Sequence, residues 1–224
     1  MAIEAKRILR NVRFKLKDNN EIEYSDYDIK NALNECIRYI NQHLALKCSD
    51  FLEKMQYVRE DDINAEIAEK NKTIQQQINA GAATKDDLIP YISLAIDGVS
   101  IPDDFISLVA VLRAKDGYHL SPVPAAETLS RFNKSEYKVF ANKIYANCDF
   151  DLLYRASIDE VTDMVNGSVE LPSMFFDAMV KLTCMILQNK PDTDVLMAET
   201  SRLMDNIVPR RRYSNIKSRM PFKV

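Results

Sequence analysis

The spacing of apolar residues divides the chain into helical segments on either side of a region with the period of strands. From Ser25 to about Lys47, apolar residues recur at steps of three and four, which places them on one face of a helix. Ser25 provides a side-chain acceptor one turn before Asp28, an arrangement related to a capping box, so we expect the helix to begin there. A shorter, basic amphipathic helix is predicted within residues 2–17.

Between residues 50 and 87 the chain becomes polar and charged, and its apolar residues form only a narrow stripe. The spacing of this stripe predicts a long helix that ends at Gly81. A narrow stripe buries little surface, so the helix either packs on a neighbour, such as another copy of the chain, or extends away from the body. The possible subunit contacts are therefore Ile63, Ile67, Ile74 and Ile78.

From Tyr91 to Ser157 the period changes to two, which indicates strands. A short helix is predicted over residues 124–132, with Pro124 in its first turn. Because the later strands are separated by one or two residues, we expect antiparallel hairpins. The predicted strands lie around residues 92–96, 106–112, 137–141, 143–146 and 149–154.

After Gly167 the pattern is helical again. Pro172 opens a segment that is apolar on nearly all sides, which is typical of a buried helix. Pro191 and Asp192 end this helix and begin another, which runs to Pro209. Because the connecting loops are short, the two helices are expected to be antiparallel.

Together these patterns predict an α+β fold, mainly a helical bundle with a small antiparallel β subdomain, a long helical insertion and an extended C-terminal tail. The predicted boundaries are 1–49 for the N-terminal helices of the bundle, 50–90 for the polar helical insertion, 91–158 for the antiparallel β subdomain, 159–209 for the C-terminal helical hairpin and 210–224 for the basic tail.

The basic tail separates the charge of the chain into two parts. Residues 210–224 contain six Lys and Arg and no acid, whereas the whole chain has a net charge of −3, so the tail carries +6 and the body −9. The tail is either a solvated end or a peptide that orders on an acidic partner or on nucleic-acid phosphate. Interspersed apolar side chains favour the second interpretation. The predicted partner-binding residues are Arg210, Arg211, Arg212, Tyr213, Ile216, Lys217, Arg219 and Phe222.

Composition and motifs argue against several functional classes. Only four glycines occur, and they are not clustered as a phosphate-binding loop requires. The four cysteines are too widely spaced for a CxxC pair, and no apolar run is long enough for a membrane span. His43 and His119 lack a partner at ligand spacing, and paired aspartates are typical of caps and turns. We therefore expect no enzyme activity, no catalytic or metal-binding residues and no cofactor.

Several short motifs occur in a defined order along the chain. They are the helix start at Ser25-Asp26, the run Val99-Ser100-Ile101-Pro102-Asp103-Asp104-Phe105 before a predicted strand, Leu120-Ser121-Pro122-Val123, Phe150-Asp151-Leu152-Leu153-Tyr154, and Val169-Glu170-Leu171-Pro172 before the apolar helix. In this order the chain resembles the head-to-tail adaptor proteins of short-tailed bacteriophages, the tail tubular protein A-like group. The similarity spans roughly residues 25–47 and 91–208.

The resemblance implies a structural virion protein with a helical bundle and a β-rich subdomain. It also implies a homo-oligomeric ring, usually twelvefold, between the portal protein and the tail or nozzle protein. Double-stranded DNA would pass through the lumen without sequence-specific contact, and no membrane would be involved. The protein would be found in the neck of the virion and, during assembly, in the host cytoplasm. The alternative from the residues themselves is a nucleic-acid-binding regulatory protein that uses its basic tail.

Overall fold

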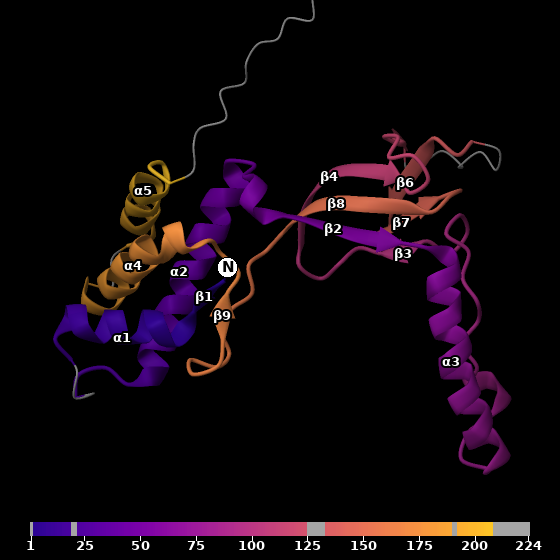
Figure 1. Cartoon of the computed structure of the whole chain (residues 1–224), viewed down its shortest axis with the longest axis horizontal. Helices are drawn as coiled ribbons and strands as arrows, with labels where there is room; N and C mark the ends of the chain where they lie inside the picture. Colours follow the sequence, from indigo (N-terminus) through magenta and orange to yellow (C-terminus); the bar gives the residue numbers. More distant parts are fainter. Residues whose placement is uncertain (1, 19–21, 125–132, 190–191, 208–224) are drawn as a thin grey trace, which may run out of the picture. The chain divides into compact units, whose positions relative to one another are not determined.

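The computed structural model describes residues 2–18, 22–124, 133–189 and 192–207, which form an α+β protein (Figure 1). This confirms the predicted fold class. The chain divides into two compact units. We call residues 1–51 and 158–224 the helical unit and residues 52–157 the β unit. None of the helices in the described ranges is long and apolar enough to cross a membrane.

The helical unit is built around one central helix. Its helices are α1 (Ala5–Leu16), α2 (Asp26–Leu46), α4 (Phe176–Asn189) and α5 (Thr193–Met204). Helix α4 contacts the other three, and its Met179 and Leu182 side chains are almost completely buried. The predicted buried helix after Pro172 is thus confirmed, with one 3₁₀ turn, Ser173–Phe175, preceding it. A two-stranded antiparallel sheet joins β1 (Ile3–Glu4) to β9 (Ser168–Val169).

Helix α2 begins at the predicted capping box. The backbone N–H of Asp28 donates to Ser25 Oγ at 3.2 Å, and the backbone N–H of Ser25 donates to Asp28 Oδ2 at 3.0 Å. This reciprocal pair satisfies donors that a helix N-terminus leaves unpaired. The apolar face that follows, including Ile29, Leu33 and Ile37, is fully buried.

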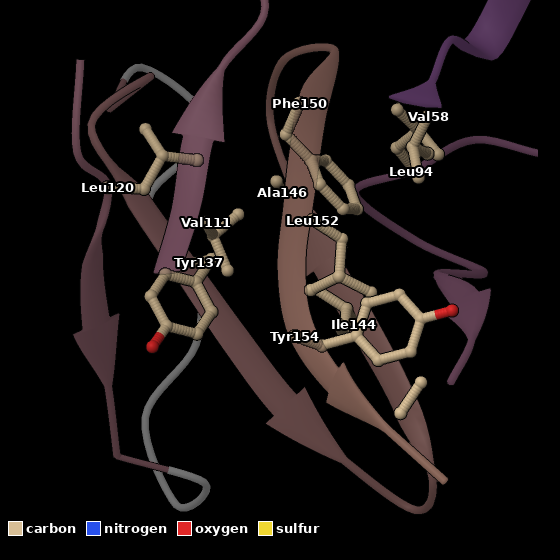
Figure 2. Close-up of a cluster of buried hydrophobic side chains, with 11 residues drawn as sticks. Val58, Leu94, Val111, Leu120, Tyr137, Ile144, Ala146, Phe150, Leu152 and Tyr154 are labelled. Atoms are coloured by element: carbon tan, nitrogen blue, oxygen red, sulfur yellow. The ribbon is translucent and has the colours of Figure 1, made fainter. Parts of the chain in front are cut away.

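The β unit contains two sheets. The first has the order β2 (Glu53–Val58), β8 (Phe150–Ala156), β4 (Phe105–Arg113), with antiparallel neighbours. The second has the order β3 (Val99–Ser100), β7 (Lys143–Ala146), β6 (Glu136–Phe140), β5 (Ser121–Val123). Alternate residues of β8, namely Phe150, Leu152 and Tyr154, belong to one apolar cluster that also includes Ile144 of β7 (Figure 2).

Four details of the β prediction need correction. Residues 53–58 form strand β2, although the pattern predicted polar helix over 50–90. Residues 92–96 are not a strand. Strands β7 and β8 belong to different sheets rather than to one hairpin, and β5 pairs with β6 in parallel. The predicted helix 124–132 is not one of these corrections, because residues 125–132 lie outside the described residues and the helix remains a prediction.

The predicted hairpin at Asn142 does form. Strands β6 and β7 are antiparallel and joined through Ala141 and Asn142, whose φ angles are 48° and 60°. Two consecutive positive φ angles match the twist of a tight hairpin turn. Asparagine tolerates this conformation better than most residues.

Helix α3 (Glu60–Asn79) is the predicted long helix of the polar region. It leaves the end of β2, as Figure 1 shows, and Gly81, with φ of 74°, follows its C-terminus as expected. Two contacts fix the start of α3 to β8 and to the residue before it. Arg59 forms an ion pair of 2.6 Å with Asp151 of β8, and the Glu60 N–H donates to Asp149 Oδ1 at 2.9 Å.

Candidate functional site

The sequence-predicted partner-binding residues lie outside the described residues. This applies to Arg210, Arg211, Arg212, Tyr213, Ile216, Lys217, Arg219 and Phe222. Their role in binding a portal or DNA remains a prediction. The surfaces that such a tail could contact are nevertheless described.

The isoleucine stripe of α3, residues Ile63, Ile67, Ile74 and Ile78, lies against other parts of the β unit. Ile67 is only 7% exposed, and Ile63 packs against the apolar cluster of the β unit. Ile74 and Ile78 are half-buried. The four residues therefore contribute to packing within the β unit, and their role as subunit contacts remains a prediction.

Two asparagine side chains of α3 bind the segment of residues 89–92 through its backbone. Asn64 donates to the carbonyl oxygen of Ile92 at 3.0 Å and accepts from the Ile92 N–H at 2.9 Å. Asn71 does the same with Ile89, at 2.8 Å in both directions. The backbone of residues 89–92 thus finds on a helix the hydrogen bonds that a neighbouring strand would otherwise supply.

The helical unit has a surface groove of about 560 Å³ with an apolar floor and an acidic rim. It lies between the first half of α2, the end of α4 and the first turn of α5. The floor includes Ala32, Ile186, Leu187 and Leu196, and the rim includes Glu23, Asp28 and Glu35. None of the described residues that line it is Lys or Arg. The groove therefore suits a ligand that combines positive charge with apolar side chains.

A buried ion pair, Arg13 with Asp18, holds residues 22–24 beside this groove. Asp18 accepts hydrogen bonds from the backbone N–H groups of Ile22, Glu23 and Tyr24, and it pairs with Arg13 at 3.4 Å. Burial alone would raise the pKa of Asp18, but the three N–H donors and Arg13 outweigh it and lower the pKa. Asp18 is therefore ionised at neutral pH and fixes Glu23 and Tyr24 at the groove.

The β unit has a larger polar hollow of about 810 Å³ near the start of α3. Its charged groups are mostly engaged. Arg113 donates to Asp116 at 2.6 and 2.9 Å, and this hydrogen bonding lowers the pKa of Asp116. Glu60 accepts from the Leu94 N–H at 2.9 Å, and Asp149 caps α3. Glu60 and Asp149 thus stabilise the start of the helix, and Arg113 and Asp116 pair with each other.

Cys36 and His43 are buried and do not line either hollow, whereas the half-buried Cys148 lines the larger one, where burial raises the pKa of its thiol. Burial raises the pKa of Cys36 to about 12, so its thiol is protonated at neutral pH. His43 has its Nε2 atom 3.8 Å from Asp205, and burial, followed by the charge of Lys47, lowers its pKa against the opposing effect of Asp205. Among the described residues, no group of three or more His, Cys, Asp or Glu side chains could hold a metal ion.

The groove and the asparagine contacts were not predicted from the sequence. The groove joins Glu23, Glu35 and Leu196 from three separate parts of the chain, and no local pattern marks it. The asparagine contacts do have a local signal, because Asn64 and Asn71 lie seven residues apart around the buried Ile67. That spacing keeps both amides on the apolar side of a helix.

Comparison with known proteins gives no family assignment. No protein-family model matches the chain, and no curated protein matches its sequence. The resemblance to phage adaptors therefore rests on the short sequence motifs.

Proposed function

We propose that this protein is a head-to-tail adaptor of a short-tailed bacteriophage, a structural virion protein that forms a ring between the portal and the tail. The observation that carries the proposal is the division into a helical unit and a β unit, since the family it resembles pairs a helical bundle with a β-rich subdomain. Double-stranded DNA would pass through the lumen of the ring.

The motifs that carry the resemblance lie at junctions of the fold. Val99 and Ser100 form β3, and Asp104 lies directly before β4. Asp104 accepts hydrogen bonds from the Tyr154 hydroxyl at 3.1 Å and from Lys54 Nζ at 3.0 Å, which connects the start of β4 to both of the other strands in its sheet. Leu171 and Pro172 directly precede the turn that opens α4. These motif residues thus connect elements of the fold, as expected for a structural protein.

The charge distribution fits a conduit for DNA. The body outside residues 210–224 carries a charge of −9. An acidic wall does not bind phosphates, so a duplex can move past it without forming the cation contacts that hold DNA. The tail would bind the portal, with arginines on carboxylates and Tyr213, Ile216 and Phe222 in apolar pockets.

Native mass spectrometry tests the adaptor proposal. The full chain is measured alone and with the portal protein encoded by the same genome. The expected result is a complex of many copies, twelve by the resemblance, in the presence of the portal. A monomer under both conditions overturns the proposal. Deletion of residues 210–224 is expected to weaken portal binding, and undiminished binding would remove the tail from this role.

The basic tail also favours a second candidate, a nucleic-acid-binding regulatory protein. Six phosphate contacts, one for each basic residue of the tail, predict that the logarithm of DNA affinity falls against the logarithm of salt with a slope of about −5. A portal contact with apolar anchors has a shallower salt dependence. Affinities measured between 50 and 200 mM salt, on a DNA duplex and on the portal, therefore separate the two candidates.

A further inference from the structure

Two acidic residues at the groove of the helical unit form no ion pair with the described part of the chain. Within the ranges that the structure describes, Glu23 and Glu35 have no ion-pair partner, and neither Lys nor Arg lines the groove. Asp28, the third acidic residue of the rim, is engaged in the capping box. A peptide that fits the groove therefore has to bring cations to the rim and apolar groups to the floor.

Residues 210–224 of this chain have both properties. They contain six basic residues and no acid, and Tyr213, Ile216 and Phe222 are interspersed among them. From this complementarity, we infer that the segment 210–224 docks in the acidic groove of its own chain. Tyr213 and Ile216 would lie against the floor residues Leu187 and Leu196, and the basic side chains of the segment would lie at Glu23 and Glu35. This contact goes beyond the adaptor role and does not depend on it.

The distance to the groove is within reach of the same chain. The described chain ends at Ile207, just after Asp205, which lies 3.2 Å from Lys47 at the end of α2. Leu196, in the first turn of α5, precedes Ile207 by eleven residues, or roughly 16 Å along a helix axis. An extended chain covers that distance in about five residues. Tyr213 is therefore the first aromatic residue that can reach the floor.

Connection through a short segment favours the same chain over a second copy. A peptide linked by a few residues is present at an effective concentration of about a millimolar. For chains that are not assembled into a ring, a second copy competes only when the protein itself reaches that concentration. At ordinary concentrations we therefore expect the contact to be intramolecular, and a portal or DNA that uses the tail has to displace it from the groove.

Zero-length cross-linking of the full chain tests the contact directly. A carbodiimide joins lysine amines to carboxylates that already touch, so Lys217 or Lys223 should be coupled to Glu23 or Glu35. The experiment uses an equal mixture of unlabelled and ¹⁵N-labelled chains. Cross-linked peptides of a single isotope support docking within one chain. Mixed-isotope pairs approaching half of the total assign the groove to a second copy and overturn the proposal, as does the absence of these cross-links.

The rate of proteolysis of residues 210–224 gives a second measurement of docking that does not depend on the carbodiimide. Replacing two rim carboxylates, E23Q with E35Q, should speed tryptic cleavage within residues 210–224 by about fivefold, because two exposed ion pairs are lost. The matched control, E66Q with E69Q, removes the same charge from the exposed side of α3 and should leave the rate unchanged. Equal cleavage rates in the two double variants would contradict docking at the groove.

Discussion

The side-chain amide of Asn64 forms both of its hydrogen bonds with the backbone of one residue, Ile92. Asn71 binds Ile89 in the same way. Seven residues of helix rise about 10.5 Å, and three residues of extended chain span about 10 Å. The two asparagines therefore match the length of the antiparallel segment that they bind.

The helical unit repeats this arrangement on α2. Asn34 donates to the Val161 carbonyl at 3.1 Å and accepts from its N–H at 2.8 Å. Asn41 binds Ile158 at 3.0 and 2.9 Å. The two helices share the pattern Asn-x-x-Ile-x-x-x-Asn, with Ile37 and Ile67 between the amides. In both units, two asparagines seven residues apart thus bind an irregular segment to a helix through its backbone.

Burial should decide how much each of these asparagines contributes to stability. Replacing Asn34 by Asp leaves the buried Val161 carbonyl facing an acceptor, so N34D should lower the free energy of unfolding by about 2–3 kcal/mol. Asn71 is only half-buried and its hydrogen bond to Ile89 is accessible to water, so N71D should cost less than about 1 kcal/mol. Urea denaturation followed by circular dichroism measures both. Equal losses would contradict this explanation.

Two glycines with the same backbone conformation should differ in their tolerance of alanine. Gly98 has φ of 63°, and an added Cβ would lie 2.8 Å from the Tyr145 ring and 3.0 Å from the Ile144 carbonyl oxygen. Gly117 has φ of 68° but open space around it. G98A should therefore destabilise the chain by about 3 kcal/mol, whereas G117A should cost about 1 kcal/mol from backbone strain alone. Thermal unfolding of the two variants tests the difference.

His43 should make stability depend on pH. Its pKa is lowered in the folded chain, first by burial and then by Lys47, so the unfolded chain binds the proton more tightly. Stability is therefore unaffected above about pH 6.5 and is lost as the pH falls from there through the folded-state pKa, by at most about 1.4 kcal/mol per pH unit.

Replacing this histidine should remove the dependence. H43Q is expected to flatten the stability profile between about pH 7 and pH 5. The control is H119Q, since His119 is exposed, and it should keep the slope of the natural chain. A profile that is unchanged in H43Q would show that another group is responsible.

The cysteines should differ widely in reactivity. Cys48 is exposed, whereas Cys36 is buried with its pKa raised to about 12. Because only the thiolate reacts, brief treatment of the folded chain with iodoacetamide should label Cys48 at least about a hundredfold faster than Cys36. Peptide mass spectrometry gives the two rates. Comparable rates would indicate that α2 opens readily from α4.

The sequence predicted helices well where the caps and the apolar face agree. Ser25, Asp28 and the stripe to Leu44 specify α2 locally, so no knowledge of its partners was needed. Gly81 likewise marked the end of α3. These features depend on residues within a few turns of each other.

The errors occurred where distant residues decide the structure. Strand β2 has one buried residue, Val58, and becomes a strand through β8, whose residues lie about a hundred positions later. Ile92 and Leu94 alternate like a strand, but their N–H groups donate to Asn64 and Glu60 of a helix. The acidic groove was missed for the same reason, since it exists only after three helices pack.

The pairing of Ile3 with Val169 has a consequence for how the chain folds during its synthesis. Ribosomes add about 5–20 residues per second, so roughly ten seconds separate α2 from its partner α4. At the end of that time every strand described within residues 52–157 has its partner, whereas the apolar faces of α1 and α2 still have no cover from α4. The later-made β unit can thus fold first, and the nascent N-terminal helices are the segment that a chaperone on the ribosome would need to protect.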